Sequence, residues 1–209
     1  IAQYPHDTGA YTQGLIWHND QLLEGTGQFK ESNLRRVDLA TGKVQQQVKN
    51  GDEIFGEGIT LLNGKIYQIT WQNKLAYVYD AATLKKEKEF PLNTEGWGLT
   101  NNGTELILSD GSSNLYFMDP LSFREIRRIG VFDHMGPKAN INELEFINGF
   151  VYANQYQTDY ILKIDPASGQ IVAKADLQQI WNRVKTIDPY ADVPNGIAYD
   201  ASTNKIYIT

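Results

Sequence analysis

The sequence predicts an all-β fold, a five-bladed β-propeller that forms a single domain over residues 1–209. Two recurring patterns predict this architecture. In the first, a polar or aromatic residue, usually followed by glycine, precedes a short aliphatic run. A period of roughly 20 to 50 residues is typical of repeat architectures. The first pattern recurs at intervals of 44, 40, 46 and 52 residues and begins at Gln13, Glu57, Trp97, Glu143 and Asn195.

The second pattern is a β-rich run that ends in aspartate and leads into a turn. Aspartate followed by proline or glycine favours a turn, because the Asp side chain bonds its own backbone and proline presets φ. Further short strands, such as 65–71 and 105–109, lie between the two patterns. About four short strands per interval is typical of a propeller blade, in which each sheet buries its faces against the next. The second pattern covers residues 34–42, 76–80, 115–120 and 161–169.

The fifth repeat is the least complete, with strands expected only at 197–199 and 205–209. Residues 1–4 precede the first repeat, and we expect them to supply an outer strand that closes the ring. The last strand stops without a turn or tail, which predicts that C-terminal residues, including a final strand, are missing. The chain opens on Ile1 rather than Met, which fits a removed secretory signal.

One segment departs from the β pattern. A short helix is expected near residues 177–185, inserted between the fourth and fifth blades, with Asp176 as N-cap and Gln179 three residues later. We expect its apolar stripe to pack against the propeller rather than to bind a ligand. The apolar residues at helical spacing are Leu177, Ile180, Trp181 and Val184.

The composition narrows the classes of function. The 209 residues carry a net charge of −6, with 41% hydrophobic and 21% charged residues, as is ordinary for one folded domain. Basic residues are interspersed with acids, so we expect no nucleic-acid partner. No stretch approaches the roughly 20 apolar residues of a membrane helix, so we expect no membrane partner. We also expect the protein to be a monomer. The absence of cysteine excludes disulfides, thiolate metal sites and a cysteine nucleophile.

The residues before each repeated glycine should meet near one mouth of the central channel, because the innermost strand of every blade runs along it. Among them Glu57 is the best candidate for catalysis, since burial raises the pKa of a carboxyl group and suits it to proton transfer. Flanking glycines allow close approach of backbone and substrate. Phe55, Trp71 and Trp97 would then line an apolar pocket. The alternative, that Glu57 only bonds backbone amides and the aromatic residues belong to the core, stays open.

Two other classes of function remain open at this point. Oxygen-rich axial residues are compatible with a metal-assisted, lactonase-like propeller hydrolase, in which Glu57, Asn142, Asn195 and Asp110 surround a divalent ion. A non-catalytic peptide-binding propeller is the other, since scaffold roles are common in this architecture. The three histidines lie in different repeats and lack the spacing of paired metal ligands.

The chain resembles the plant-type glutaminyl cyclases, the glutaminyl-peptide cyclotransferases of plants and bacteria. Characteristic segments are Phe55-Gly-Glu-Gly-Ile-Thr60 and Glu95-Gly-Trp-Gly-Leu-Thr100. Nine matching segments run in order along almost the whole chain, which makes the resemblance specific. They are residues 5–7, 11–15, 55–60, 68–71, 95–100, 109–113, 141–145, 157–159 and 195–198.

The resemblance implies a five-bladed propeller that converts the N-terminal glutamine of peptides or proteins to pyroglutamate and releases ammonia. It implies that catalysis requires no metal, allows for a structural calcium in the channel, and fits a secreted or periplasmic protein. Glu57 would be the proton shuttle. The implied substrate contacts are Gln13 and Asn142, and the implied pocket walls are Tyr11, Phe55, Trp71 and Trp97.

Two departures from the family pattern stand out. Tyr156, within residues 154–158, takes the place of a family tryptophan, and because a phenol still stacks we expect altered affinity rather than loss of binding. The family also continues beyond the position of Thr209 with a Gly-Lys pair whose lysine lines the active site. That pair is absent from this sequence, which leaves open whether the chain as given is active.

Overall fold

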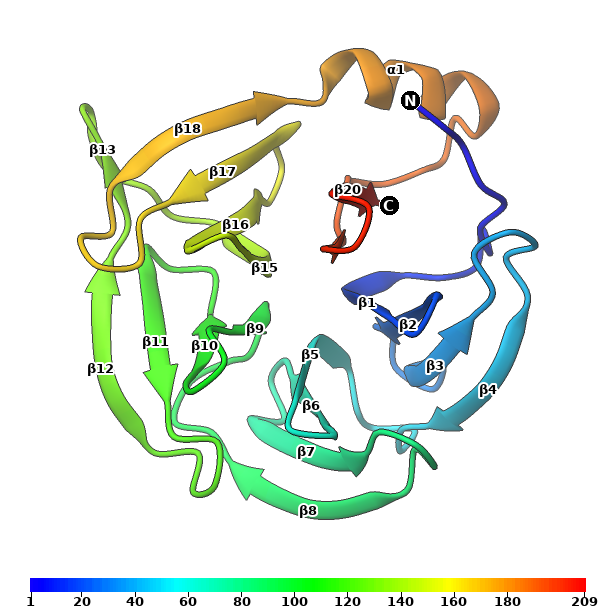
Figure 1. Ribbon diagram of the computed structural model, residues 1–209, viewed down its shortest axis with the longest axis horizontal. Coiled ribbons are helices and arrows are strands. Elements are labelled where there is room, and N and C mark those ends of the chain that lie inside the picture. Colours follow the sequence, from blue (N-terminus) through cyan, green and yellow to red (C-terminus); the bar gives the residue numbers. More distant parts are fainter.

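The computed structural model describes residues 1–209 and contains four four-stranded antiparallel sheets arranged around a central axis (Figure 1). Blade 1 is β1 (Thr12–His18), β2 (Gln21–Thr26), β3 (Asn33–Val37) and β4 (Val44–Lys49). Blade 2 is β5 (Gly56–Leu62), β6 (Lys65–Thr70), β7 (Leu75–Asp80) and β8 (Lys86–Pro91). Blade 3 is β9 (Leu99–Asn101), β10 (Leu106–Ser109), β11 (Asn114–Met118) and β12 (Glu125–Gly130). Blade 4 is β15 (Ile141–Ile147), β16 (Phe150–Gln155), β17 (Tyr160–Ile164) and β18 (Ile171–Asp176).

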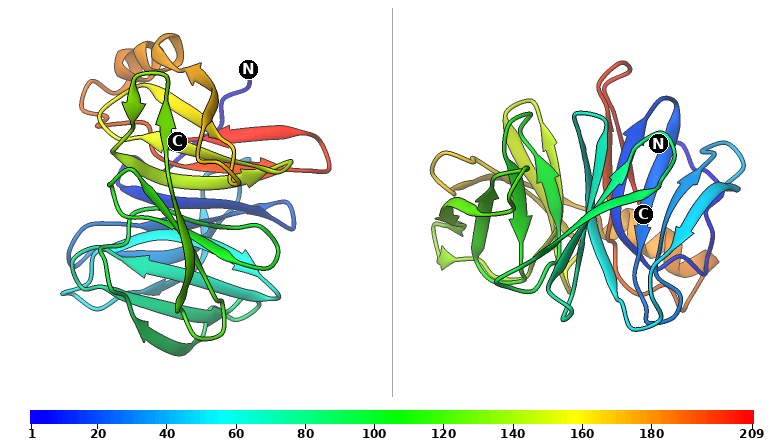
Figure 2. Two further views of the ribbon diagram at one scale, coloured as in Figure 1. Left: turned by 90° about the vertical axis from the view of Figure 1, so that its left-hand side faces the viewer. Right: turned by 90° about the horizontal axis from the view of Figure 1, so that it is seen from below.

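The prediction of five blades is wrong, because the structure has four. The segment after the fourth blade forms only a two-stranded hairpin, β19 (Ile197–Asp200) and β20 (Lys205–Ile208), which lies between blades 4 and 1 (Figure 1). Its turn projects beyond the blades (red in Figure 2). The repeated pattern marks where an inner strand begins, and it does so at the hairpin as well. A blade, however, also needs two outer strands, which the hairpin lacks.

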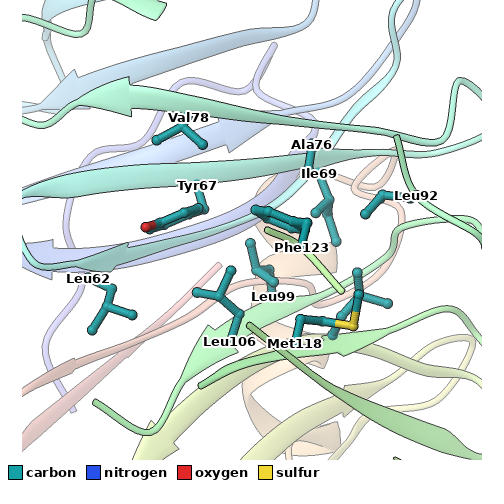
Figure 3. Close-up of a cluster of buried hydrophobic side chains, with 11 residues drawn as sticks. Leu62, Tyr67, Ile69, Ala76, Val78, Leu92, Leu99, Leu106, Met118 and Phe123 are labelled. Carbon is teal, nitrogen blue, oxygen red and sulfur yellow. The ribbon is translucent and has the colours of Figure 1, made fainter. Parts of the chain in front are cut away.

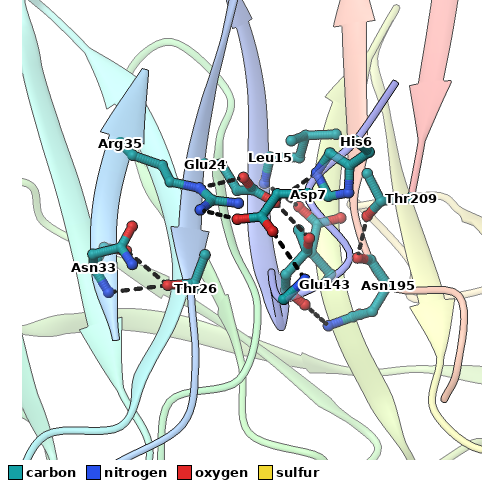
Figure 4. Close-up of polar contacts among 12 residues, drawn as sticks. His6, Asp7, Leu15, Glu24, Thr26, Asn33, Arg35, Glu143, Asn195 and Thr209 are labelled. Carbon is teal, nitrogen blue, oxygen red and sulfur yellow. Dashed lines mark hydrogen bonds and ion pairs between the residues drawn. The ribbon is translucent and has the colours of Figure 1, made fainter. Parts of the chain in front are cut away.

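The prediction that residues 1–4 close the ring as a strand is also wrong. These residues form no strand, and the ring of Tyr4 lies edge-on to that of Tyr207 in the hairpin, with 6.2 Å between the ring centres. The residues that follow, His6 and Asp7, contact side chains of blade 1 instead (Figure 4). His6 Nε2 lies 3.0 Å from Glu24 Oε1, and Asp7 Oδ2 lies 2.8 Å from a terminal guanidinium nitrogen of Arg35.

The repeated glycines allow neighbouring inner strands to approach each other closely. A Cβ on Gly14 would lie 2.4 Å from the backbone nitrogen of Ile59, and one on Gly98 would lie 2.0 Å from the carbonyl oxygen of Asn142. Real Cβ atoms do not approach backbone so closely, so only glycine fits at these positions. The first sequence pattern therefore reflects the close packing of neighbouring blades at the axis.

The hydrophobic core lies between adjacent blades. The cluster of 11 buried residues between blades 2 and 3 is shown in Figure 3 and includes Ile69, Leu99 and Phe123. Similar clusters of nine and 10 residues lie between blades 1 and 2 and between blades 3 and 4. The hairpin contributes to clusters of only four and three residues. Each full blade thus buries its faces against its neighbours, and the hairpin sector is packed least.

The predicted helix is present as α1 (Gln178–Ile187), which lies between blade 4 and the hairpin in sequence (Figure 1). Asp176 accepts the backbone N–H of Gln178 at 2.9 Å, although Leu177 occupies the N-cap position. Leu177 is buried and Ile180 packs against the same small cluster. No helix in the structure has the length and hydropathy needed to span a membrane. A second insertion, β13 (Phe132–Asp133) and β14 (Gly136–Pro137), follows blade 3.

Candidate active site

Four polar residues of the first pattern are buried near the axis. Gln13 on β1 and Glu57 on β5 are 8% and 6% exposed. Asn195, which precedes β19, donates from Nδ2 to Gln13 Oε1 at 2.9 Å. Glu143 on β15 is fully buried. A side-chain hydrogen bond therefore links β1 of blade 1 to the residue that precedes the hairpin.

Glu57 is held without a hydrogen-bond partner for its Oε2 atom. Burial, and next the negative charge of Glu95, raise the pKa of Glu57 well above the usual range of a carboxyl group. An unpaired buried carboxyl of this kind is costly unless a ligand uses it. The Oε2 atom of Glu57 therefore accepts no backbone amide, unlike in the alternative role.

Aromatic side chains form two groups beside the buried carboxyl. Phe55 contacts Tyr11 and Trp71 edge-on, with ring centres 6.2 and 5.4 Å apart. Trp97 contacts Tyr156 in the same manner at 5.6 Å. Burial and the neighbouring Asp192 raise the pKa of the Tyr11 phenol to about 12, and smaller contributions come from Tyr156 and Glu57. The carbonyl of Trp97 accepts the N–H of Gly58 at 2.9 Å, so both aromatic groups adjoin the segment that carries Glu57.

Two further glycines make room for these rings. A Cβ on Gly27 would lie 2.5 Å from Cε1 of Phe55, and a Cβ on Gly111 would lie 2.6 Å from the six-membered ring of Trp97. Because each ring lies directly against a loop backbone, its position is set by packing rather than by a flexible neighbour. These loops thus fix the aromatic walls.

Sequence reasoning did not single out two acidic residues that bond to the aromatic walls. Glu95 Oε2 accepts the indole N–H of Trp71 at 2.9 Å, and Asp192 Oδ2 accepts the hydroxyl of Tyr11 at 3.1 Å. Glu95 lies within a segment of the family resemblance, so a signal for it was present. Asp192 follows α1 in a loop and had none.

Several buried polar atoms at the site have no hydrogen-bond partner. Trp97 Nε1 is an unpaired donor, and Asn142 Oδ1 and Asn195 Oδ1 are unpaired acceptors, in addition to Glu57 Oε2. Buried polar groups in folded proteins are nearly always paired, so a group of unpaired ones points to a polar ligand. The set offers both a donor and acceptors, which fits a ligand that carries an amine and an amide.

Glu143 serves a structural role. Its Oε1 atom accepts the backbone N–H of Leu15 at 3.3 Å (Figure 4). The carboxyl also bonds the backbone of Ile197, whereas its Oε2 atom has no partner. Burial and the nearby Glu145 raise the pKa of Glu143 well above its usual range. At the corresponding position of blade 4 a leucine, Leu144, replaces the glycine. Glu143 therefore links blade 4 to blade 1 and to the hairpin.

Glu145, two residues along β15, makes the stability of the fold depend on pH. Its Oε1 atom accepts the backbone N–H of Tyr199 at 3.0 Å, and burial raises its pKa to about 8. The folded protein then binds more protons than the unfolded chain between about pH 4.3 and pH 8, so stability falls as pH rises through that window. We expect a lower melting temperature at pH 8 than at pH 5, by roughly 5 °C, measured by circular dichroism. The decrease should be smaller in Glu145→Gln, and an equal decrease would contradict this origin.

One of the residues that would surround a divalent ion in a metal-assisted hydrolase is Asp110. Asp110 is engaged by other partners, since its Oδ2 accepts the hydroxyls of Thr94 and Tyr116 at 2.8 Å each. No group of three or more Asp, Glu, His or Cys side chains is arranged to hold a metal ion. A structural calcium in the channel, which the resemblance allowed, stays a prediction.

The fold and the site together define a small β-propeller with an unpaired buried carboxyl between aromatic walls. The family model for glutamine cyclotransferase matches residues 1–209, and the chain belongs to this family. The chain is 38% identical over 212 residues to the glutaminyl-peptide cyclotransferase of Arabidopsis thaliana. The match covers 100% of this chain and 66% of that protein, so the chain spans slightly under two thirds of its length.

Solved structures agree with the family assignment. The crystal structure of Myxococcus xanthus glutaminyl cyclase matches with a TM-score of 0.93 and 32% identity, over 100% of this chain and 89% of that one. The WD40 domain of Neurospora crassa Pan2 matches with a TM-score of 0.56 and 12% identity, over 90% of this chain and 55% of that one. The second likeness concerns the propeller fold alone.

Proposed function

We propose that this chain is a glutaminyl-peptide cyclotransferase that converts an N-terminal glutamine of a peptide or protein to pyroglutamate and releases ammonia. The observation that carries the proposal is the buried carboxyl of Glu57, whose Oε2 atom is unpaired. Family membership supports the same reaction. Phe55, Trp71 and Trp97 give the site apolar walls that suit the methylene groups of a glutamine side chain.

Glu57 is proposed to move one proton between two nitrogen atoms. The α-amine attacks the side-chain carbonyl carbon, and a new carbon–nitrogen bond forms. Ionised Glu57 takes a proton from the attacking nitrogen and passes it to the amide nitrogen, whose bond to the carbon then breaks and frees ammonia. The carboxylate is regenerated, so atoms and charge balance. A raised pKa suits this role, because a base works best when its pKa is near the working pH.

The unpaired atoms of the site complement the other polar groups of glutamine. The unpaired indole N–H of Trp97 is proposed to donate to the carbonyl oxygen, on which negative charge develops during attack. The side-chain oxygens of Asn142 and Asn195 are acceptors for the hydrogens of the amine and amide. Gln13 is proposed to act mainly by holding Asn195, to which it is hydrogen-bonded.

An ammonia-release assay tests the proposal directly. A Gln-initiated peptide is incubated with the protein, and ammonia and the loss of one ammonia from the peptide are followed together, with and without a chelator. An Asn-initiated and an N-acetylated Gln peptide serve as controls. We expect equal amounts of ammonia and cyclised peptide from the Gln peptide only. Binding without turnover would point to a peptide-binding propeller, and loss of turnover on chelation to a metal-assisted reaction.

Glu95 should influence catalysis through the pKa of Glu57. Its negative charge is one of the two causes that raise that pKa, the other being burial. In Glu95→Gln we therefore expect the pKa of Glu57 to fall, and the acid limb of the profile of kcat/KM against pH to move to lower pH. The glutamine can still accept from the Trp71 indole, so a change in height without a shift of the limb would contradict the electrostatic role.

A further inference from the structure

Phe29, in the loop between β2 and β3, is an exposed aromatic residue in contact with a wall of the site. Its ring is 5.5 Å from that of Phe55, in an edge-to-face arrangement, and the residue is 47% exposed. Phe29 belongs to none of the hydrophobic clusters between blades. Other exposed apolar residues lie elsewhere, such as Leu121 in the turn after β11 and Ile126 on the outer strand β12. Phe29 is thus an exposed member of the aromatic group in which Tyr11, Trp71 and Phe29 each contact Phe55.

The loop that carries Phe29 is held rigidly at both ends. Gly27 donates its N–H to the carbonyl of Tyr11 at 2.7 Å, and the hydroxyl of Ser32 accepts the N–H of Gly56 at 2.9 Å. The loop is thereby bonded to the two segments that carry Tyr11 and Glu57. A rigid loop that leaves an aromatic ring half exposed is pre-organised for a contact with a ligand.

The residues on both sides of Phe29 have a left-handed backbone. Gln28 has a φ of 78° and Lys30 a φ of 70°, a region that residues other than glycine rarely adopt. Lys30 is fixed there by a hydrogen bond from its N–H to the carbonyl of Asp52 at 3.0 Å. Strain of this kind is found where a loop must present a side chain in one direction.

A peptide bound by its N-terminal glutamine must leave the site through the mouth. The Cα atom of its second residue is about 3.8 Å from that of the glutamine, so the second side chain lies one residue nearer to the mouth. Phe29 contacts the wall residue Phe55 with 5.5 Å between ring centres, and it is the more exposed of the two. We propose that Phe29 forms a subsite for the side chain of the second residue of the substrate and that it favours an aromatic side chain there. This inference rests on the cyclotransferase function proposed above.

Three substrates separate the subsite from the reaction itself: glutamine amide, a Gln-Gly peptide and a Gln-Phe peptide of equal length. In Phe29→Ala we expect kcat/KM for Gln-Phe to fall about tenfold, mostly through KM, as suits loss of an aromatic contact. Values for glutamine amide and Gln-Gly should be unchanged. Phe29→Tyr should restore the preference, and Leu121→Ala, which also removes an exposed apolar side chain, should leave all three values unchanged.

The outcomes distinguish the two proposals. An unchanged ratio of Gln-Phe to Gln-Gly in Phe29→Ala would overturn the subsite while leaving the reaction in place. A proportional loss with all three substrates would also overturn it, since it would show a general effect on the site. If the unaltered protein turned over none of the substrates, the proposed reaction would fail, and the subsite with it.

Discussion

We expect Glu57→Gln to lower kcat by about 10³-fold, because a glutamine amide cannot take a proton from the attacking amine, and proton transfer contributes roughly 10²- to 10⁴-fold to such reactions. KM should change little, since glutamine has nearly the same volume and leaves the aromatic walls in place. Steady-state ammonia release from a Gln-initiated peptide measures both constants.

The same substitution should not destabilise the fold. Oε2 of Glu57 has no partner, and burial disfavours its charged form, so a neutral amide removes a cost of folding. The melting temperature of Glu57→Gln should equal or exceed that of the unaltered protein. A loss of activity together with a lower melting temperature would instead indicate damage to the fold.

Glu143→Gln is the matched control. Glu143 is as deeply buried as Glu57, burial raises its pKa in the same direction, and its Oε2 is likewise unpaired, but its Oε1 accepts the backbone N–H of Leu15. We expect this variant to change stability and to retain kcat. If both variants lost activity equally, a general need for buried axial carboxyls would replace the specific role of Glu57.

The inner strands were the most predictable part of the fold. Glycine is required where neighbouring inner strands touch, as Gly58 touches Leu99 and Gly98 touches Asn142. Because this contact recurs in successive blades, the glycines recur at regular intervals in the sequence. The helix α1 was predictable for a similar reason, since its apolar spacing reflects one side that is partly covered, with Ile180 packed against a small cluster. In both cases the signal is local and repeats at a regular interval.

The number of blades was not predictable in this way. A complete blade requires strands to pair in space, and the pattern at Asn195 marks only the first of them. The path of residues 1–10 depends on the pairing of His6 and Asp7 with Glu24 and Arg35. Asp7 and Arg35 are 28 residues apart, and no periodicity records such a contact.

The candidate site also contains residues that the sequence predicted and residues that it did not. Glu57 and Phe55 lie beside repeated glycines, and the repeat placed them near the axis. Glu95 and Asp192 were missed because each acts through a partner elsewhere in the chain, Trp71 at a distance of 24 residues and Tyr11 at 181. Their role depends on which loops meet at the mouth, which only the folded chain shows.

Arg35→Met is expected to lower the free energy of unfolding by about 3–5 kcal/mol, the usual cost of removing one partner from a buried ion pair. The side chain of Glu24 is fully buried and that of Arg35 is 6% exposed, with Arg35 Nε 2.8 Å from Glu24 Oε2. Burial alone would raise the pKa of Glu24, but His6, Arg35 and the Thr12 hydroxyl outweigh it and the pKa is lowered. Without Arg35 the effect of burial is opposed less strongly, and the pKa of Glu24 rises.

The loss should depend on pH in a defined direction. In the unaltered protein the lowered pKa of Glu24 contributes stability above the pKa of an unfolded glutamate, and this is lost as pH falls through the folded value. In Arg35→Met the buried charge becomes a cost that grows as pH rises. The difference between the two proteins should therefore widen from acidic to neutral pH, and the melting temperature at neutral pH should differ by roughly 10 °C.

Urea unfolding at acidic and neutral pH measures the effect, and Arg128→Met is the matched control. Arg128 also pairs with a glutamate, Glu125, through two contacts of 2.6 and 2.8 Å, but its side chain is 56% exposed. An exposed pair of this kind should cost less than about 1 kcal/mol when broken. Replacing both buried partners, in Glu24→Gln with Arg35→Met, should recover part of the loss, because no charge is then left buried alone. Equal losses in Arg35→Met and Arg128→Met would show that burial does not decide the strength of this pair. The anchoring of residues 5–10 beside Tyr11 would then need another source.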